Sequence, residues 1–350
     1  MNKIIETFIK IVSIDSPSGY EEKISLYLQS WLKKNKFSYR IDKVRNIYAY
    51  NQVNGQPILL CAHMDTVQPG ENIKPIVKDG IIKSSGNTIL GADNKAALTA
   101  ILSAIENIKL TRSIELIFSV KEETGGGIEF FPFSWIKSKD ALIFDSANPL
   151  GGIILRSPFI INFHVTVHGK AVHASKPNEG VNALTYAIKF INQIKTGSLD
   201  NGETTINIGK IDGGSGINTI PELVSYSGEI RSYDKKLFKK HLNKIKVIHH
   251  PKSKLPVIID FSVDGFCSGY THKKSDEFVK KIDQLYQNLH LKTQYYNYSG
   301  VSDANILNSK EIKTINLTDG VKDPHTVNES ITIKSLIQLE NIIKKFLLSY

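Results

Sequence analysis

The first segment of this chain with residue types suited to catalysis lies at residues 61–67 (CAHMDTV), directly after a short apolar run. His63 and Asp65 stand two residues apart there, so their side chains project to one side if the backbone stays extended. A metal-bound imidazole needs an acceptor that holds its second nitrogen, and Asp65 is placed to be that acceptor. Taken alone, the segment is better explained by a hydrogen-bonded structural histidine next to an aspartate in a turn.

A second segment, residues 91–95 (GADNK), opens a stretch in which apolar residues follow helical spacing. Asp and Asn are favoured at helix N-caps, so Asp93 has a purely structural explanation. The chemical explanation is that the Asp93 carboxylate bridges two cations. The spacing alone leaves both explanations open.

The third segment, residues 121–127 (KEETGGG), follows another apolar run. The side chains of Glu122 and Glu123 diverge because the residues are consecutive. One carboxylate can therefore bind a metal while the other faces a water molecule, the division between Lewis acid and general base that metal-assisted hydrolysis needs. A solvated acidic turn explains the segment equally well in isolation.

Asp145 ends a fourth apolar run, and His325 lies far downstream in residues 323–329 (DPHTVNE). Each could be an ordinary loop residue by itself. Together with the earlier segments they give a set of candidate metal ligands, namely His63, Asp93, Glu123, Asp145 and His325. Mixed carboxylate and imidazole ligands suit zinc, with cobalt or manganese as substitutes. We therefore expect two Zn²⁺ per subunit.

Short apolar runs predict the strands that must position these residues, at 58–62, 114–120, 141–144 and 312–317. Helical spacing follows Asp93 and recurs at residues 335–346. This alternation predicts an α/β fold with a mixed, mostly parallel sheet flanked by helices. Open α/β sheets bind ligands beyond the carboxyl ends of their strands, which gives the candidate ligands a common place to meet.

The middle of the chain has a different pattern. Residues 159–167 alternate apolar and polar side chains, which predicts a half-exposed strand. The apolar residues of the helix expected next lie near helical spacing: Val181, Leu184, Ile188, Ile191 and Ile194.

Two strands, a helix around Phe238 and a last strand complete this part, the strands lying at 205–208, 223–230 and 256–263. The resulting β-α-β-β-α-β order is the ferredoxin-like split unit. We therefore predict an inserted α+β domain at residues 158–266, within a discontinuous catalytic domain formed by residues 1–157 and 267–350.

The composition is that of an ordinary globular protein of 350 residues, with a net charge of +10. The densest lysine run, residues 235–254, has apolar residues at i, i+4 and i+7, so its lysines fall on the solvated side of a helix. No zinc-finger, helix-turn-helix or aromatic-interleaved pattern accompanies the charge. We expect no nucleic-acid partner.

Two cysteines, Cys61 and Cys267, cannot build a disulfide framework, which fits a reducing compartment. No run approaches the roughly 18 to 20 apolar residues that a membrane span needs. The first 16 residues contain Glu6 within their apolar stretch and favour an amphipathic helix over a signal peptide. We expect a cytoplasmic protein without a membrane partner.

The ordered segments CAHMDTV, GADNKAAL, KEETGG, Asp145 and HTVNE resemble the co-catalytic two-zinc metallopeptidases, a family that includes peptidase T, carboxypeptidase G and the acetylornithine deacetylases. The resemblance runs along nearly the whole chain. It implies that the inserted domain is a lid and dimerisation domain. It also implies a cis peptide bond after the bridging aspartate, here Asp93-Asn94.

The same resemblance implies a role for each candidate residue. One metal takes His63 and Asp145, the other takes Glu123 and His325, and Asp93 bridges them. Glu122 is the general base and acid, and Asp65 orients His63.

Residues of the inserted domain also resemble the family. In residues 167–175 (VHGKAVHAS), the resemblance makes His173 a residue that holds the oxyanion, often across a dimer. It implies substrate contacts for Asn218 and for Arg231, whose guanidinium suits a bidentate carboxylate clamp. The alternatives are an exposed loop histidine and a surface ion pair.

The resemblance also implies a substrate contact at Gly300, in residues 298–303 (YSGVSD). Val301 departs there from the double glycine often seen in relatives, so the substrate contacts of this segment can differ from theirs.

The resemblance is strongest to peptidase T-like proteins, because Asp145 replaces the glutamate typical of the deacetylase branch. A tripeptide aminopeptidase acting on short peptides is therefore the first expectation. A carboxypeptidase or N-acyl amino acid deacylase on the same scaffold is the alternative. A metal-free peptide-binding protein is a second alternative, which the intact ligand set disfavours. A homodimer through the inserted domain is also implied.

Overall fold

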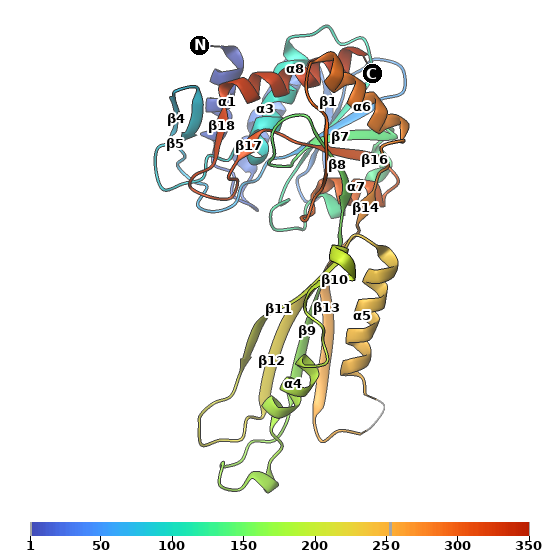
Figure 1. Ribbon diagram of the computed structural model, residues 1–350. Helices are drawn as coiled ribbons and strands as arrows, with labels where there is room; N and C mark the ends of the chain where they lie inside the picture. Colours follow the sequence, from blue (N-terminus) through green and yellow to red (C-terminus); the bar gives the residue numbers. More distant parts are fainter. Residues whose placement is uncertain (1, 252–253, 350) are drawn as a thin grey trace. The chain divides into compact units, whose positions relative to one another are not determined.

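The structure, a computed structural model, describes residues 2–251 and 254–349. The chain forms two compact units (Figure 1). Unit 1 contains the chain up to Leu155 and again from His272 onward, and unit 2 contains Arg156–Thr271. The domain limits expected from the sequence, 157/158 and 266/267, lie within a few residues of these boundaries.

A mixed nine-stranded sheet forms the centre of unit 1. Its four middle strands run parallel to one another, in the order β6 (Ile114–Ser119), β3 (Ile58–His63), β7 (Asp140–Phe144) and β16 (Lys313–Leu317). The outer strands are β1 (Ser38–Ile41) and β2 (Ile47–Tyr50) on one side, and β8 (Gly152–Ser157), β14 (Tyr270–Thr271) and β15 (Gln294–Asn297) on the other. The predicted α/β fold class is confirmed.

The parallel strands are buried on both faces, as their continuous apolar runs predict. Helix α3 (Ala92–Glu106) lies against β3 and β7 and is itself covered by α1 (Lys3–Val12) and α8 (Ile333–Ser349). The other helices of unit 1 are α2 (Glu22–Lys34), α6 (Glu277–Asn288) and α7 (Asp303–Ser309), with the short 3-10 helices η1 (Ile128–Phe130) and η2 (Phe133–Trp135).

A small four-stranded antiparallel sheet was not expected from the sequence. Its strands, in order, are β17 (Val321–Lys322), β18 (Ser330–Thr332), β5 (Ile81–Ser84) and β4 (Pro75–Lys78). Strand β5 leads towards the start of α3, while the loop between β17 and β18 contains His325. The small sheet therefore brings the His325 loop next to the segment that contains Asp93.

The described residues of unit 2 form a five-stranded antiparallel sheet with two α-helices and two short 3-10 helices. Its elements are β9 (Phe159–His168), η3 (Pro177–Glu179), α4 (Ala183–Ile191), β10 (Gly197–Leu199), η4 (Asp200–Gly202), β11 (Thr204–Gly213), β12 (Leu223–Ser232), α5 (Lys235–His249) and β13 (Ile258–Cys267). The strand order is β10-β11-β12-β9-β13. The predicted ferredoxin-like order is confirmed, with β10 as an additional short edge strand.

Helix α4 buries a different face from the one that the apolar spacing suggests. Ala183, Ala187 and Phe190 are buried, whereas Leu184 and Ile188 are 38% and 47% exposed. Both faces of α4 are apolar, so spacing alone could not identify the inner one.

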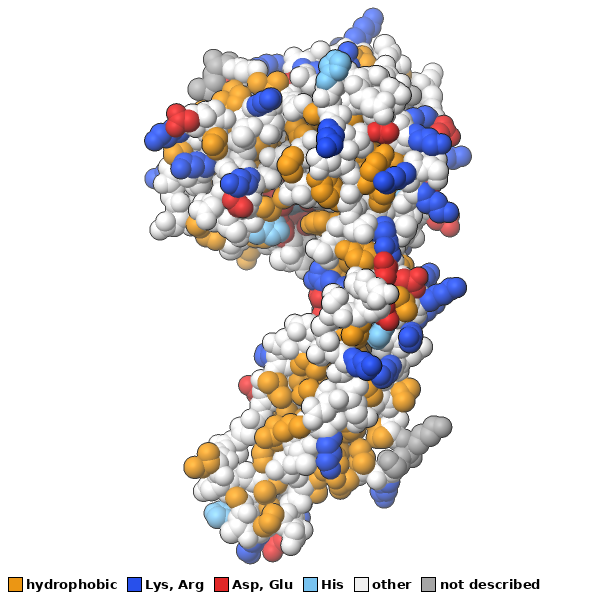
Figure 2. Space-filling model, viewed as in Figure 1, with side chains coloured by type: hydrophobic (Ala, Val, Ile, Leu, Met, Phe, Trp, Pro, Cys, Tyr) orange, Lys and Arg blue, Asp and Glu red, His pale blue; other side chains and the backbone are white. Residues whose placement is uncertain are grey.

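The lysines of α5 are exposed while Phe238 and Ile245 are buried, as predicted. Lys and Arg side chains are scattered over the visible face of the molecule and do not form one patch (Figure 2). Among the described residues, no helix combines the length and apolar character that a membrane span requires.

Close packing in the unit 2 sheet leaves no room for a side chain at Gly228. A Cβ there would lie 2.3 Å from the Asn207 carbonyl oxygen and 2.3 Å from the Phe163 ring. We predict that Gly228→Ala lowers the free energy of unfolding by about 1–3 kcal/mol through overpacking. Urea denaturation measures this change. The control is Gly209→Ala, whose nearest neighbour is the side-chain nitrogen of Asn207 at 3.3 Å. Equal stability of the two variants would contradict the predicted packing.

Candidate active site

Three of the candidate ligand segments meet where the parallel strands of unit 1 end. His63 is the last residue of β3, Asp145 follows the last residue of β7, and the Glu122–Glu123 pair follows β6. His63 and Ser119 are register partners on β3 and β6, so both strands end at the same level. The site thus lies at the carboxyl edge of the sheet, where ligands of open α/β sheets bind.

The backbone around Asp93 resolves one ambiguity of the sequence. The N-cap residue of α3 is Gly91, with φ 70°, and among the described residues the Asp93 carboxylate contacts imidazoles and not backbone N–H groups of the helix. Asp93 and Asn94 have non-helical backbone angles, and the peptide bond between them is cis, as the family resemblance implied. The Asp93 carboxylate faces His63 and His325.

The two oxygens of Asp93 face two different imidazoles. Oδ1 lies 3.3 Å from Nε2 of His63, and Oδ2 lies 3.3 Å from Nε2 of His325. The same His325 nitrogen lies 2.9 Å from Oε1 of Glu123. A carboxylate placed between two histidines in this way has the geometry of a bridging ligand.

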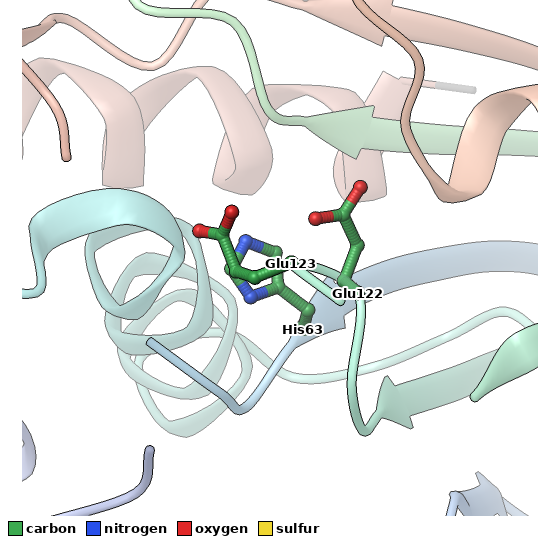
Figure 3. Close-up of side chains that lie close together, drawn as sticks. All are labelled: His63, Glu122 and Glu123. Carbon is green, nitrogen blue, oxygen red and sulfur yellow. The ribbon is translucent and has the colours of Figure 1, made fainter. Parts of the chain in front are cut away.

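Among the residues that the structure describes, three groups of side chains have ligand atoms within 4.8 Å of one another. The first contains His63, Asp93 and Asp145, and the second contains Asp93, Glu123 and His325. These two groups share Asp93. The third contains His63, Glu122 and Glu123, whose side chains extend from the end of β3 and from the loop after β6 (Figure 3).

Asp65 connects the His63 strand to the Glu122–Glu123 loop. Its carboxylate accepts hydrogen bonds from the backbone N–H groups of Glu122 (3.0 Å) and Glu123 (3.2 Å) and from the Ser18 hydroxyl (2.6 Å). Nδ1 of His63 lies 2.9 Å from the Asp65 carbonyl oxygen and 3.4 Å from its carboxylate. The backbone carbonyl is thus nearer to the imidazole than the expected carboxylate.

Negative charge accumulates strongly here. Burial, together with the neighbouring carboxylate of Asp93, raises the pKa of Asp145 well above its usual range. Burial and the Asp145 carboxylate do the same to the pKa of Glu122. Hydrogen bonds to Asp93 and Glu123 raise the pKa of His325 to about 10. Divalent cations would relieve this repulsion, and the imidazole and carboxylate donors fit zinc.

The site is reachable from solvent on one side. The His63 side chain is 2% exposed and Asp145 is 7% exposed, whereas the His325 side chain is 48% exposed. A substrate can therefore approach from the His325 side.

Side chains that the sequence did not single out hold the candidate ligands in place. The Asn316 side chain accepts a hydrogen bond from the Asp145 N–H (3.0 Å) and donates one to the Asp145 carbonyl (2.8 Å). The Asp303 carboxylate accepts a hydrogen bond from the Ser119 hydroxyl at the end of β6. No local pattern marks Asn316, whereas Asp303 belongs to the segment 298–303 noted for Gly300.

The expected lid residues belong to unit 2. His173 is exposed, with Nδ1 2.8 Å from the Ser175 hydroxyl, and the carbonyl of Asn218 accepts a hydrogen bond from the Ala174 N–H at 2.8 Å. Arg231 forms a two-point ion pair with Glu229, at 2.5 and 2.8 Å. This ion pair is the structural alternative for Arg231, and the substrate roles of all three residues stay predictions.

Gly300 lies in unit 1, just before α7. A Cβ at this position would lie 2.9 Å from the Tyr298 ring, so close packing against Tyr298 accounts for the glycine. A substrate contact at Gly300 also stays a prediction.

Comparisons with known proteins show similarity to peptidases in both sequence and structure. Residues 159–254 match the peptidase dimerisation domain of the M20 family. A tripeptidase from Staphylococcus aureus is 31% identical, with a TM-score of 0.92 over 99% of this chain and 98% of that one. The aminopeptidase PepT from Bacillus cereus is 28% identical, with a TM-score of 0.92 over 99% and 97%.

Curated relatives include proteins with other names. The protein YqjE of Bacillus subtilis is 28% identical over 97% of this chain and 96% of its own. A succinyl-diaminopimelate desuccinylase of Wolbachia pipientis is 24% identical over 99% and 93%, and a probable carboxypeptidase of Aspergillus clavatus is 27% identical over 73% and 72%. Since the similarity to the tripeptidase extends over nearly its whole length, this chain belongs to the M20 family of peptidases and is a peptide-bond hydrolase.

Proposed function

We propose that this protein is a two-metal aminopeptidase that removes the N-terminal residue from short peptides, tripeptides above all. The observation that carries the two-metal part is the pair of ligand groups that share Asp93. The similarity to a tripeptidase and to PepT supports the aminopeptidase part.

In this proposal, His63 and Asp145 would hold one cation, Glu123 and His325 would hold the other, and Asp93 would be shared by both. Zinc is the metal that we propose, and cobalt or manganese can substitute for it. When bound, the two cations supply Lewis acidity that polarises the scissile carbonyl and makes a water molecule acidic. The protein residues then handle the proton and orient the substrate.

Glu122 is the proposed general base. Its carboxylate accepts a proton from the attacking water and afterwards delivers it to the leaving amine nitrogen. Burial and the Asp145 carboxylate raise the pKa of Glu122, so this carboxyl group holds a proton more tightly than a solvent-exposed glutamate does. The hydrogen bond from its backbone N–H to Asp65 fixes the segment that bears this carboxylate.

Unit 2 is proposed to supply the remaining contacts. By resemblance, His173 donates a hydrogen bond to the oxyanion that develops on the substrate, and Asn218 and Arg231 bind its backbone or carboxylate. To bind the substrate, Arg231 would have to break its ion pair with Glu229 and form a new one with the substrate carboxylate. The dimerisation domain in unit 2 supports a homodimer, and the low cysteine content supports a cytoplasmic location.

A carboxypeptidase or N-acyl amino acid deacylase is the second candidate. Relatives named as a probable carboxypeptidase and as a desuccinylase favour it. A metal-free binding protein has less support, because the structure brings the full set of candidate ligands together.

The proposed role of Glu122 can be tested by substitution. Replacing Glu122 by Gln removes the proton acceptor but leaves the proposed ligands intact, so kcat should fall by roughly 10²–10⁴ while metal content is unchanged. Steady-state kinetics and metal analysis measure both quantities. Glu129→Gln is the control, since Glu129 is an exposed residue of the same loop region. A Glu122→Gln variant with wild-type kcat would remove Glu122 from this role.

The proposed substrate can be tested with pairs of free and N-terminally blocked peptides. Unblocked tripeptides should lose their N-terminal residue, and the same peptides with an acetylated N-terminus should be cleaved at least about tenfold more slowly. Mass spectrometry of the products identifies the bond that breaks, and a chelator should abolish the reaction. Efficient hydrolysis of acetylated peptides would instead favour the deacylase, and release of the C-terminal residue would favour the carboxypeptidase.

A further inference from the structure

We propose that Glu329 is a positioning residue that fixes the Asp93 carboxylate relative to His325, an inference that rests on the two-metal function proposed above. Glu329 is 1% exposed and lies four residues after His325, in the same loop between β17 and β18. It belongs to none of the candidate metal-binding groups among the described residues. Glu329 can therefore influence metal binding only by positioning other residues.

Both oxygens of Glu329 bind the backbone that carries Asp93. Oε2 accepts a hydrogen bond from the Gly91 N–H at 2.7 Å, and Oε1 accepts one from the Asp93 N–H at 2.9 Å. The first N–H groups of a helix have no partner within the helix, and a negative charge is favourable at that end. Glu329 thus acts on the start of α3 from a loop more than two hundred residues away.

The Asp93 segment is also held from the opposite direction. The Asn94 side chain donates a hydrogen bond of 2.5 Å to the carbonyl of Phe144, the residue before Asp145. Asn94 therefore links Asp93 to one ligand of the first proposed cation, and Glu329 links it to the loop of His325, a ligand of the second. A bridging carboxylate needs a defined distance to both sides, and these two side chains set it.

The substitution Glu329→Gln tests this role at nearly constant volume. Glutamine keeps one acceptor oxygen but turns an NH₂ group towards a backbone N–H, so two donors face each other. The Asp93 segment must then shift. Glu329→Asp is the second variant, because it keeps the charge but its shorter side chain cannot reach both N–H groups.

A matched control is available in the nine-stranded sheet, at the end opposite to the strand ends that carry the ligands. Glu115, in β6, is 2% exposed, and its carboxylate accepts hydrogen bonds from the N–H groups of Lys137 and Ser138, both at 2.9 Å. Glu115→Gln removes the same kind of interaction far from the strand ends that carry the ligands. If lower stability were the only cause of weaker metal binding, Glu329→Gln and Glu115→Gln should both bind metal more weakly.

The experiment titrates metal-free full-length protein with Co²⁺, followed by visible absorption, and with Zn²⁺, followed by calorimetry. Residues that orient metal ligands typically contribute 10- to 100-fold in affinity. We expect Glu329→Gln to weaken binding of at least one ion by that factor and to change the Co²⁺ spectrum, with a smaller effect for Glu329→Asp. Glu115→Gln should bind like the wild type, whatever its melting temperature.

Wild-type affinity and spectrum in Glu329→Gln would overturn the inference, as would equal weakening in Glu115→Gln. If Glu329→Gln does not fold, Glu329→Asp decides by the same criteria. Failure of the wild-type protein to bind either metal would overturn the two-metal function itself, and the two outcomes are thereby distinguished.

Discussion

The structure of this peptidase depends on keeping several carboxylates close together in a largely buried place. Asp93, Glu123 and Asp145 converge with two imidazoles, and Glu122 stands beside them. Burial and mutual repulsion disfavour the charged forms, which is visible in the raised pKa values of Asp145 and Glu122. Cations can balance this charge, and a protein that fixes each oxygen beforehand does not have to order its ligands when the cations bind.

The fold achieves this fixation with hydrogen bonds to the backbone of the segments that carry the ligands. Asp65 accepts hydrogen bonds from the backbone N–H groups of Glu122 and Glu123. Asn316 forms hydrogen bonds with both the N–H and the carbonyl of Asp145. Glu329 accepts a hydrogen bond from the N–H of Asp93. In each case the supporting residue comes from a different element than the ligand. A ligand whose backbone is hydrogen-bonded to another element is held more rigidly than a ligand on an unsupported loop.

Much of this architecture could be predicted from the sequence. Continuous apolar runs identified the parallel strands, and because such strands end at one edge of a sheet, His63, Glu123 and Asp145 could be expected to meet. The alternating pattern of residues 159–167 identified the first strand of unit 2. The candidate ligands could also be identified locally, because their residue types and their positions directly after predicted strands are visible in the sequence.

The remainder depends on contacts that local patterns do not contain. Asn316 and Glu329 act across 171 and 236 residues. Glu329 ends the segment HTVNE, but neither residue's local sequence shows which backbone groups it binds. The small sheet that places His325 uses strands of two to four residues, too short to give a periodic pattern. Asp93 could not be separated from an N-cap, because that distinction lies in backbone angles. The inner face of α4 was ambiguous because both faces are apolar.

The central claim is that two cations share the Asp93 carboxylate. Anomalous diffraction at the zinc absorption edge, from crystals of the zinc-loaded protein, tests it directly. The account predicts two peaks beside Asp93, one next to His63 and Asp145 and the other next to Glu123 and His325. A single peak, or zinc bound without contact to Asp93, would contradict it.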